Sequence, residues 1–345
     1  MGRPSARLRG AAAQSLTIVA QRTSTPFLAM LALLLRALYL FLLLCGAWLG
    51  SWLALQSTQH GFGALSLLWV PLATLGLPLL LHFLVILNAM ILSRTGDAGA
   101  RWWRQLWAEY RSAVGIFMLR QPWPRRPNGV QKPLTSTHAP SAPSAVPVVL
   151  VHGFVCNHRV WDDMALALRQ AGHPVLAIDL EPLFGSIDDY AVVIEAAAQR
   201  LQNETGAPQV ALVGHSMGGL AIRAWLRTLD KTQMGRVARI LTLGTPHQGT
   251  RIPQPVATSN GVQMYWHSSW LQALQTSEGA EQHALMHIAL NLNDNICFPQ
   301  RDQTLPGVSV TEFHGIGHLE MCRNPRVIDW TCQQLAPSPQ QGTPA

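Results

Sequence analysis

A single serine lies among glycines in the segment GHSMGG, residues 214–219. The segment matches the pattern Gly-x-Ser-x-Gly, which can hold a nucleophilic serine on a sharp turn between a strand and a helix. Gly214 and Gly218 keep side chains out of such a turn. The same pattern also fits a turn that only packs a strand against a helix, so the context must decide whether Ser216 does chemistry.

The flanking residues favour a catalytic turn. Residues 210–213 form an apolar run that predicts a buried strand, and residues 217–229 have helical character. A helix that begins directly after the serine directs its positive end at a developing oxyanion. The backbone N–H of Met217 is therefore the expected first oxyanion donor, in a nucleophile elbow that also includes His215 and Gly219.

A second oxyanion donor is expected from the loop after an earlier strand. Residues 149–154 read VLVHGF, an apolar strand that ends in a His-Gly turn. The glycine allows the chain to bend so that the N–H of Phe154 points to the same space as the first donor. His152, in the same turn, is a candidate for the substrate pocket. An ordinary glycine turn at a strand end is the alternative interpretation.

A serine hydroxyl needs a base to take its proton and a carboxylate to orient that base. In this strand-turn-helix arrangement the chain order is serine, acid, histidine. Asp294 follows an apolar run at 286–290 and is preferred to the more distant Asp302. His318 lies in a glycine-containing loop after the last expected strand and is preferred to His314, which is closer to that strand. Together with the serine, this pair forms a predicted catalytic triad.

The elements that must position these residues alternate between strand and helix. The expected strands are apolar throughout, which is typical of a mainly parallel sheet covered by helices on both faces. The strands are expected at residues 148–151, 175–178, 210–213, 240–243, 286–290 and 308–313, and the helices at 161–170, 190–202, 217–229 and 326–335. The sequence therefore predicts an α/β fold for this part of the chain.

The N-terminal third has a different composition. Residues 1–93 carry a net charge of +5 without any acidic residue, residues 94–132 carry +6 and the remainder carries −4, against +7 for the whole chain. Basic residues that flank apolar runs suit a membrane surface, and they give no support for a body that binds nucleic acid. The uncharged runs 37–55 and 64–92 are each long enough to cross a hydrocarbon core of about 30 Å.

Arginines flank both outer sides of these two runs, whereas the loop at 56–63 has no lysine or arginine. The positive-inside rule therefore predicts a hairpin in the inner (cytoplasmic) membrane, with the C-terminal body in the cytoplasm. A cleaved signal peptide over about the first 55 residues is the rival interpretation, and it would place the body in the periplasm or outside the cell. The lipid bilayer is a predicted partner, and no obligate protein partner is inferred.

Composition divides the chain into six segments. They are a basic N-terminal segment (1–36), two transmembrane helices (37–93), a juxtamembrane amphipathic helix (94–120), a proline-rich linker (121–146), a catalytic domain (147–335) and a flexible tail (336–345). The amphipathic helix carries Trp102, Trp103 and Trp107 among arginines, which suits the headgroup region, although a helix packed on the body is the alternative. The prolines of the linker predict a semi-extended tether.

These motifs together resemble those of the α/β-hydrolase superfamily, and within it bacterial triacylglycerol lipases and esterases. The resemblance rests on VLVHGF, on GHSMGG, on GTPHQGT at residues 244–250 and on the placement of the aspartate and the histidine, and it covers 147–335. It implies the α/β-hydrolase fold, the triad and the two oxyanion amides described above. It also implies a reaction that needs neither a metal nor an organic cofactor.

The resemblance further implies a membrane-anchored hydrolase that cleaves carboxylic esters, lipid or acyl esters above all, through an acyl-enzyme. In such lipases the segment that contains His247 borders the active site without supplying the base. Trp266 and Trp270 lie in a short insert that is either a cap over an acyl pocket or ordinary helix packing. Acyl transfer and thioester hydrolysis are the alternatives among enzymes, and a non-catalytic membrane scaffold is the alternative outside them.

Five cysteines are present: Cys45, Cys156, Cys297, Cys322 and Cys332. They show no Cys-x-x-Cys or Cys/His spacing of a metal site, and we interpret them as buried thiols without a role. An aspartate nucleophile, as dehalogenases and epoxide hydrolases of the superfamily use, is disfavoured because the turn holds a serine.

Overall fold

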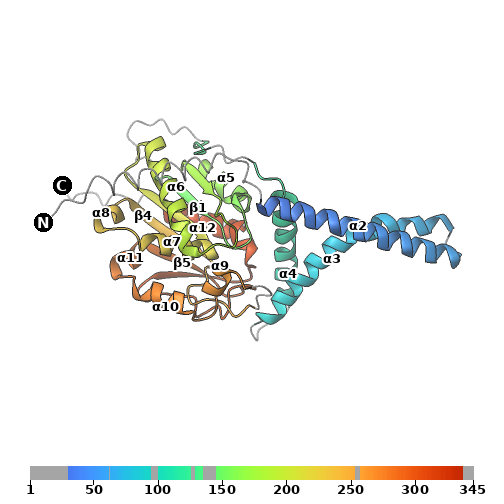
Figure 1. Ribbon diagram of the computed structural model, residues 1–345. Helices are drawn as coiled ribbons and strands as arrows, with labels where there is room; N and C mark the ends of the chain where they lie inside the picture. Colours follow the sequence, from blue (N-terminus) through green and yellow to red (C-terminus); the bar gives the residue numbers. More distant parts are fainter. Residues whose placement is uncertain are drawn as a thin grey trace, which may run out of the picture.

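A helical hairpin projects from an α/β body in the computed structural model (Figure 1). The structure describes residues 30–61, 63–94, 100–125, 129–134, 145–252 and 257–336. Most of the predicted basic N-terminal segment and nearly all of the predicted tail therefore fall outside the described residues.

Six strands form one sheet in the order β2-β1-β3-β4-β5-β6, and every neighbouring pair is parallel. The strands are β1 (Val148–Val151), β2 (Val175–Ile178), β3 (Val210–His215), β4 (Val237–Leu243), β5 (Met286–Asn291) and β6 (Ser309–Phe313). The predicted fold class is confirmed. All four residues of β1 and of β2 are buried, which explains why their sequences are apolar throughout.

Helices cover both faces of this sheet (Figure 1). Val149 and Val151 point to the face that packs against α6 (Tyr190–Thr205) and α7 (Met217–Leu226). Val148 and Leu150, which alternate with them, belong to the opposite hydrophobic cluster, together with residues of α4 (Ala100–Ala113), α5 (Asp162–Gln170) and α12 (Pro325–Leu335).

Local sequence sets the ends of several elements. Gly206 ends α6 in the left-handed region at φ 70°, and Asn324 caps α12 with Pro325 as its first residue. Asp230 forms a capping box with Gln233 at the start of α8. The shorter elements are η3 (His158–Trp161), η4 (Ile187–Asp189), α8 (Lys231–Met234), α9 (Ser259–Gln263), α10 (Ser269–Thr276), α11 (Ala280–Ala284) and η5 (Leu319–Cys322).

The hairpin consists of α2 (Met30–Gln59), η1 (Gly63–Leu68) and α3 (Trp69–Leu92). Its two arms, each 30 residues long, have the length and composition of membrane spans, a property that a signal sequence near the N-terminus shares. A Cβ atom at Gly46 or Gly50 would lie 2.7 Å or 2.6 Å from backbone Cα atoms of α3. These glycines therefore let the two helices pack at close range, as small residues do between membrane helices. The side of the membrane on which the body lies stays a prediction.

The juxtamembrane helix predicted within residues 94–120 is present as α4, and a π-helical segment, Val114–Arg120, continues it. Leu106 and Ile116 are fully buried against the body, whereas Trp103 and Trp107 are exposed. The helix thus packs on the body, as the alternative interpretation expected, and its exposed side carries Trp103 and Trp107 together with arginines. Figure 1 places α4 between the hairpin and the sheet.

The predicted linker is not a free tether where the structure describes it. Gln121 is fully buried, and its backbone and side-chain oxygens accept hydrogen bonds from Asn157 at 3.0 Å. Gln131 pairs with Val175 through two backbone hydrogen bonds and so extends the edge of the sheet. The tether prediction is wrong for these residues. Gln121 provides hydrogen-bond acceptors for the buried Asn157, and Gln131 pairs with the edge strand β2. Residues 135–144, in the middle of the linker, lie outside the described residues.

Candidate active site

Ser216 occupies the turn between β3 and α7 with φ 55° and ψ −127°. A residue other than glycine rarely adopts this conformation, and strain of this kind accumulates at functional sites. Its N–H donates to the carbonyl of Leu243 at 2.9 Å, which fixes the turn against β4. A Cβ at Gly218 would collide with the carbonyl oxygen of Val151 at the end of β1, and it would lie only 2.7 Å from that of His152. The glycines of the motif are therefore required by close packing of the backbone.

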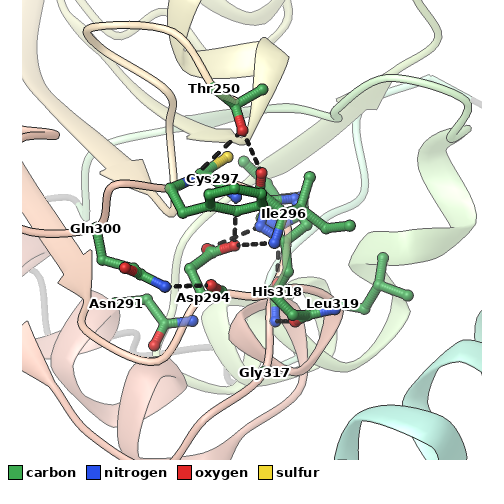
Figure 2. A network of polar contacts seen from close by, with 12 residues as sticks. Thr250, Asn291, Asp294, Ile296, Cys297, Gln300, Gly317, His318 and Leu319 are labelled. Atoms are coloured by element: carbon green, nitrogen blue, oxygen red, sulfur yellow. Dashed lines mark hydrogen bonds and ion pairs between the residues drawn. The ribbon is translucent and has the colours of Figure 1, made fainter. Parts of the chain in front are cut away.

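Asp294 and His318 face each other in the loops after β5 and β6 (Figure 2). The Nδ1 atom of His318 lies 2.8 Å from Oδ2 of Asp294, and both side chains are almost completely buried. The other carboxylate oxygen accepts hydrogen bonds from the N–H groups of Ile296 at 2.8 Å and Cys297 at 2.7 Å. Because these donors hold the carboxylate in place, Nδ1 of the histidine is its natural donor and Nε2 is left to accept a proton.

The thiol of Cys297 joins this pair to the serine. It lies close enough to His318 and to Ser216 to interact with both, and so it connects the pair to the serine. Burial, followed by the charge of Asp294, raises the pKa of this thiol to about 11, against the hydrogen bonds that lower it. Sequence reasoning missed Cys297, although it lies only three residues after the predicted acid.

The environment of His318 favours its protonated form. Burial acts to lower the pKa of the ring, but the charge of Asp294 and the contact with Cys297 outweigh it and raise the pKa well above the usual value of 6.5. The backbone of the histidine is held as well, since its N–H donates to the side chain of Asn295 at 2.8 Å.

The loop after β1 lies directly against the serine. A Cβ at Gly153 would be 2.8 Å from Cβ of Ser216, so only glycine allows this approach. Phe154 follows, with its ring 6.0 Å from that of Phe184, and Val155 takes a positive φ of 51°. The two predicted oxyanion donors thus belong to the segment next to the serine and to the first residue of α7. Their role remains a prediction.

Two histidines near the serine support the backbone. His152 accepts a hydrogen bond from the N–H of Leu180 at 2.9 Å on Nε2, and its Nδ1 lies 2.8 Å from the carbonyl oxygen of Gly153. Both ring nitrogens are thus occupied by backbone groups, which argues against the predicted place of His152 in the substrate pocket. His215 donates from Nε2 to the carbonyl of His318 at 3.0 Å and so connects the elbow to the histidine loop.

His247 lies outside the reacting cluster. Its ring nitrogens lie 3.3 Å from the guanidinium of Arg223 and 3.0 Å from the hydroxyl of Thr242, and the arginine forms a buried ion pair with Glu278 at 2.6 Å. Burial, followed by the charge of that arginine, lowers the pKa of His247 well below 6.5. These contacts give His247 a place in the packing of α7, and a contact of His247 with substrate stays a prediction.

The two tryptophans of the insert each contact a charged side chain. Trp266 lies under the guanidinium of Arg251 at 5.0 Å, and Nε1 of Trp270 donates to Asp188 at 2.9 Å. Their role in an acyl pocket remains a prediction. The rejected triad alternatives are both exposed: His314 lies 3.8 Å from Glu312, and Asp302 lies in the loop before β6.

The side chains of Asp294, Cys297 and His318 also have the types found in metal sites, with ligand atoms within 4.8 Å of one another. Both carboxylate oxygens of Asp294 are already occupied by hydrogen-bond donors, which suits an orienting acid better than a metal ligand. A separate cavity of about 340 Å³ is lined by Arg125, His158, Arg159 and Asp162 among others, and it contains no member of the serine cluster.

The geometry agrees with comparisons to known proteins. Residues 148–312 match the model of the alpha/beta hydrolase family, a range that includes Ser216 and Asp294 and ends before His318. This part of the chain has the alpha/beta-hydrolase fold. The mature form of the lipase BlEst2 of Bacillus licheniformis has the same fold, with a TM-score of 0.51 and 18% identity over 61% of this chain and 97% of that one.

Two curated proteins match parts of the chain. The bifunctional epoxide hydrolase 2 of Rattus norvegicus is 31% identical over 137 residues, which are 36% of this chain. The GPI inositol-deacylase of Phaeosphaeria nodorum is 33% identical over 84 residues, or 24% of this chain. The chain spans only 24% of the length of the first relative and 7% of the second.

Proposed function

We propose that this protein is a membrane-anchored serine hydrolase that cleaves carboxylic esters. The observation that carries the proposal is the strained Ser216 at the strand-helix turn, joined through one thiol to a buried Asp294–His318 pair with a 2.8 Å contact. The family match supports hydrolase chemistry, and the serine at the elbow favours ester cleavage over the reaction in the name of the rat epoxide hydrolase.

In the first half-reaction, Oγ of Ser216 attacks the ester carbonyl while Nε2 of His318 takes the hydroxyl proton. The carbonyl oxygen becomes an oxyanion, which the N–H groups of Phe154 and Met217 stabilise. Removing one such donor typically costs about 100- to 1000-fold in rate. The imidazolium then returns the proton to the departing alcohol, and the acyl group stays on the serine.

In the second half-reaction, a water molecule gives one proton to His318 and attacks the acyl-enzyme. The same two amides bind the second oxyanion, and the proton returns to Oγ of Ser216 as the acid leaves. Asp294 holds the ring throughout and stabilises its charged form.

The start of α2 supports a lipid ester as the substrate. Leu31 and Leu35 pack against Leu183 and Val155, in the two loops that carry the neighbouring rings of Phe184 and Phe154. The proposed oxyanion loop thus borders the apolar hairpin, where an acyl chain could pass from a bilayer to the serine without crossing water.

A fluorophosphonate probe tests the proposal on the full-length protein in detergent or liposomes. We expect labelling of the wild type and loss of labelling in Ser216→Ala, with ester hydrolysis reduced at least about a thousandfold. Ser309→Ala, which changes an exposed serine of β6, is the matched control and should label normally.

The proposal is wrong if folded wild-type protein does not react with the probe and does not cleave any of a range of esters. That range should extend from short-chain acyl esters to monoacylglycerols. Transfer of the acyl group to an added alcohol in preference to water would instead identify an acyltransferase.

A further inference from the structure

The carboxylate of Glu109 lies behind the proposed catalytic histidine. This residue belongs to α4, it is completely buried, and its two oxygens accept hydrogen bonds from the N–H of Leu319 at 2.9 Å and of Glu320 at 3.0 Å. These are the two residues that follow His318. A Cβ on Gly317, the residue before the histidine, would collide with the same carboxylate. The histidine loop is therefore shaped around one side chain of a helix outside the matched hydrolase segment.

A second side chain of α4 holds the same region. Nε2 of Gln105 donates to the carbonyl of Asn293 at 2.6 Å and to that of Ile316 at 3.0 Å. Gln105 and Glu109 are four residues apart and so share one face of the helix. That face binds the residue before Asp294 and both sides of His318, which places the two members of the acid-base pair on a common support.

An uncharged side chain could also accept hydrogen bonds at the position of Glu109, so the effect of its charge on His318 is a separate question. Glu109 lies close enough to His318 for the charge of that ring to lower the carboxyl pKa, whereas the charge of Asp294 raises it. The buried thiol of Cys322 lies close enough for the charge of Glu109 to raise the thiol pKa. Glu320 lies on η5, and Arg323 follows that element directly. Burial, the largest influence, raises the pKa of Glu109 to about 7. By reciprocity, an ionised Glu109 must favour the protonated ring of His318.

We propose that Glu109 is a positioning residue for the reaction, which fixes the His318 loop and favours the imidazolium that forms during catalysis. This inference rests on the proposed serine hydrolase function. If Glu109 has this role, α4 is part of the active-site structure, and the helix that follows the hairpin contacts the loop of His318 directly.

The test compares the wild type with Glu109→Gln and with Arg104→Gln, which changes an exposed residue of the same helix. An amide keeps the size of the side chain but presents an acceptor to only one of the two N–H donors and carries no charge. For Glu109→Gln we expect kcat to fall about 10- to 100-fold with KM within twofold. The acid limb of the pH profile of kcat/KM should move to lower pH, because the ring loses a neighbouring negative charge. Arg104→Gln should match the wild type.

The outcomes separate this inference from the proposed function. An active wild type together with an unchanged kcat and an unchanged acid limb in Glu109→Gln would overturn the inference alone. A wild type without ester hydrolysis or probe labelling would overturn both. If Glu109→Gln does not fold, Gln105→Leu serves instead: a fall in kcat at constant KM supports a positioning role of the α4 face, and wild-type kinetics overturn it.

Discussion

At the scale of single residues, the side chain of Asp294 is fixed by more hydrogen bonds than the ring of His318. Asp294 accepts two backbone N–H groups and one ring, which leaves it no freedom to rotate. The ring of His318 is held at Nδ1 by that carboxylate and interacts with the thiol of Cys297. The proposed proton-transferring ring is thus held by a carboxylate that is itself fixed by the backbone.

The raised pKa of His318 gives a pH prediction. The ring must be neutral to accept the proton of Ser216, so the rate falls as the pH falls through the pKa of the ring. Burial lowers the pKa of His318, but the charge of Asp294 and the contact with Cys297 together raise it by more. We therefore expect the acid limb of the kcat/KM profile above pH 6.5. Stopped-flow or continuous ester assays between pH 5 and 9 measure it. A limb below the usual histidine value would contradict the geometry of the pair.

At the scale of elements, the sequence predicted the hydrolase body well. The strands at 148–151 and 175–178 match to the residue, because short apolar runs bounded by polar turns leave few alternatives. The triad candidates are also brought together, since each follows the carboxyl end of a parallel strand. Cys297 and Glu109 could not be found this way, because their contacts arise from how loops and α4 pack in three dimensions.

The linker shows why composition alone was insufficient. Six prolines indicated that no regular element runs through residues 121–146, which holds for the described part of this segment, but they carried no information about single buried contacts. Gln121 and Gln131 supply backbone partners to the body from within this segment. Such contacts depend on which unpaired groups the neighbouring elements leave, and a linear pattern does not record them.

The close packing of α2 on α3 gives a prediction at the same scale. A leucine at Gly50 would push against the backbone of Trp69 and Val70, so we expect Gly50→Leu to lower the melting temperature in detergent by several degrees. Gly76→Leu, at a position of α3 with open space, is the matched control and should melt like the wild type. Equal melting temperatures for the two variants would show that the helices do not pack through the glycine face.

At the scale of the whole molecule, the buried Glu109 links stability to pH. Its pKa rises from 4.5 to about 7 on folding, so the folded protein binds more protons than the unfolded chain within that window. The free energy of unfolding should therefore fall as the pH rises from about 4.5 to 7, by up to about 3 kcal/mol from this group.

The variant Glu109→Gln has no such group, and its melting temperature relative to the wild type should rise across the same window. Thermal melts of both proteins at half-unit steps of pH measure the difference. A difference that does not change with pH would mean that Glu109 titrates near its usual value.

Because α4 packs behind the histidine loop, the N-terminal anchor cannot be exchanged together with α4 independently of the body. Many enzymes carry their anchors on spacers that can be shortened, exchanged or removed without loss of the catalytic unit. Here the residues just after the hairpin fill a gap behind the histidine loop and cover apolar surface with Leu106 and Ile116. A recombination that joined this hydrolase body to a foreign anchor at residue 147 would leave Leu319 and Glu320 without an acceptor. The natural unit of exchange is therefore α4 together with the body.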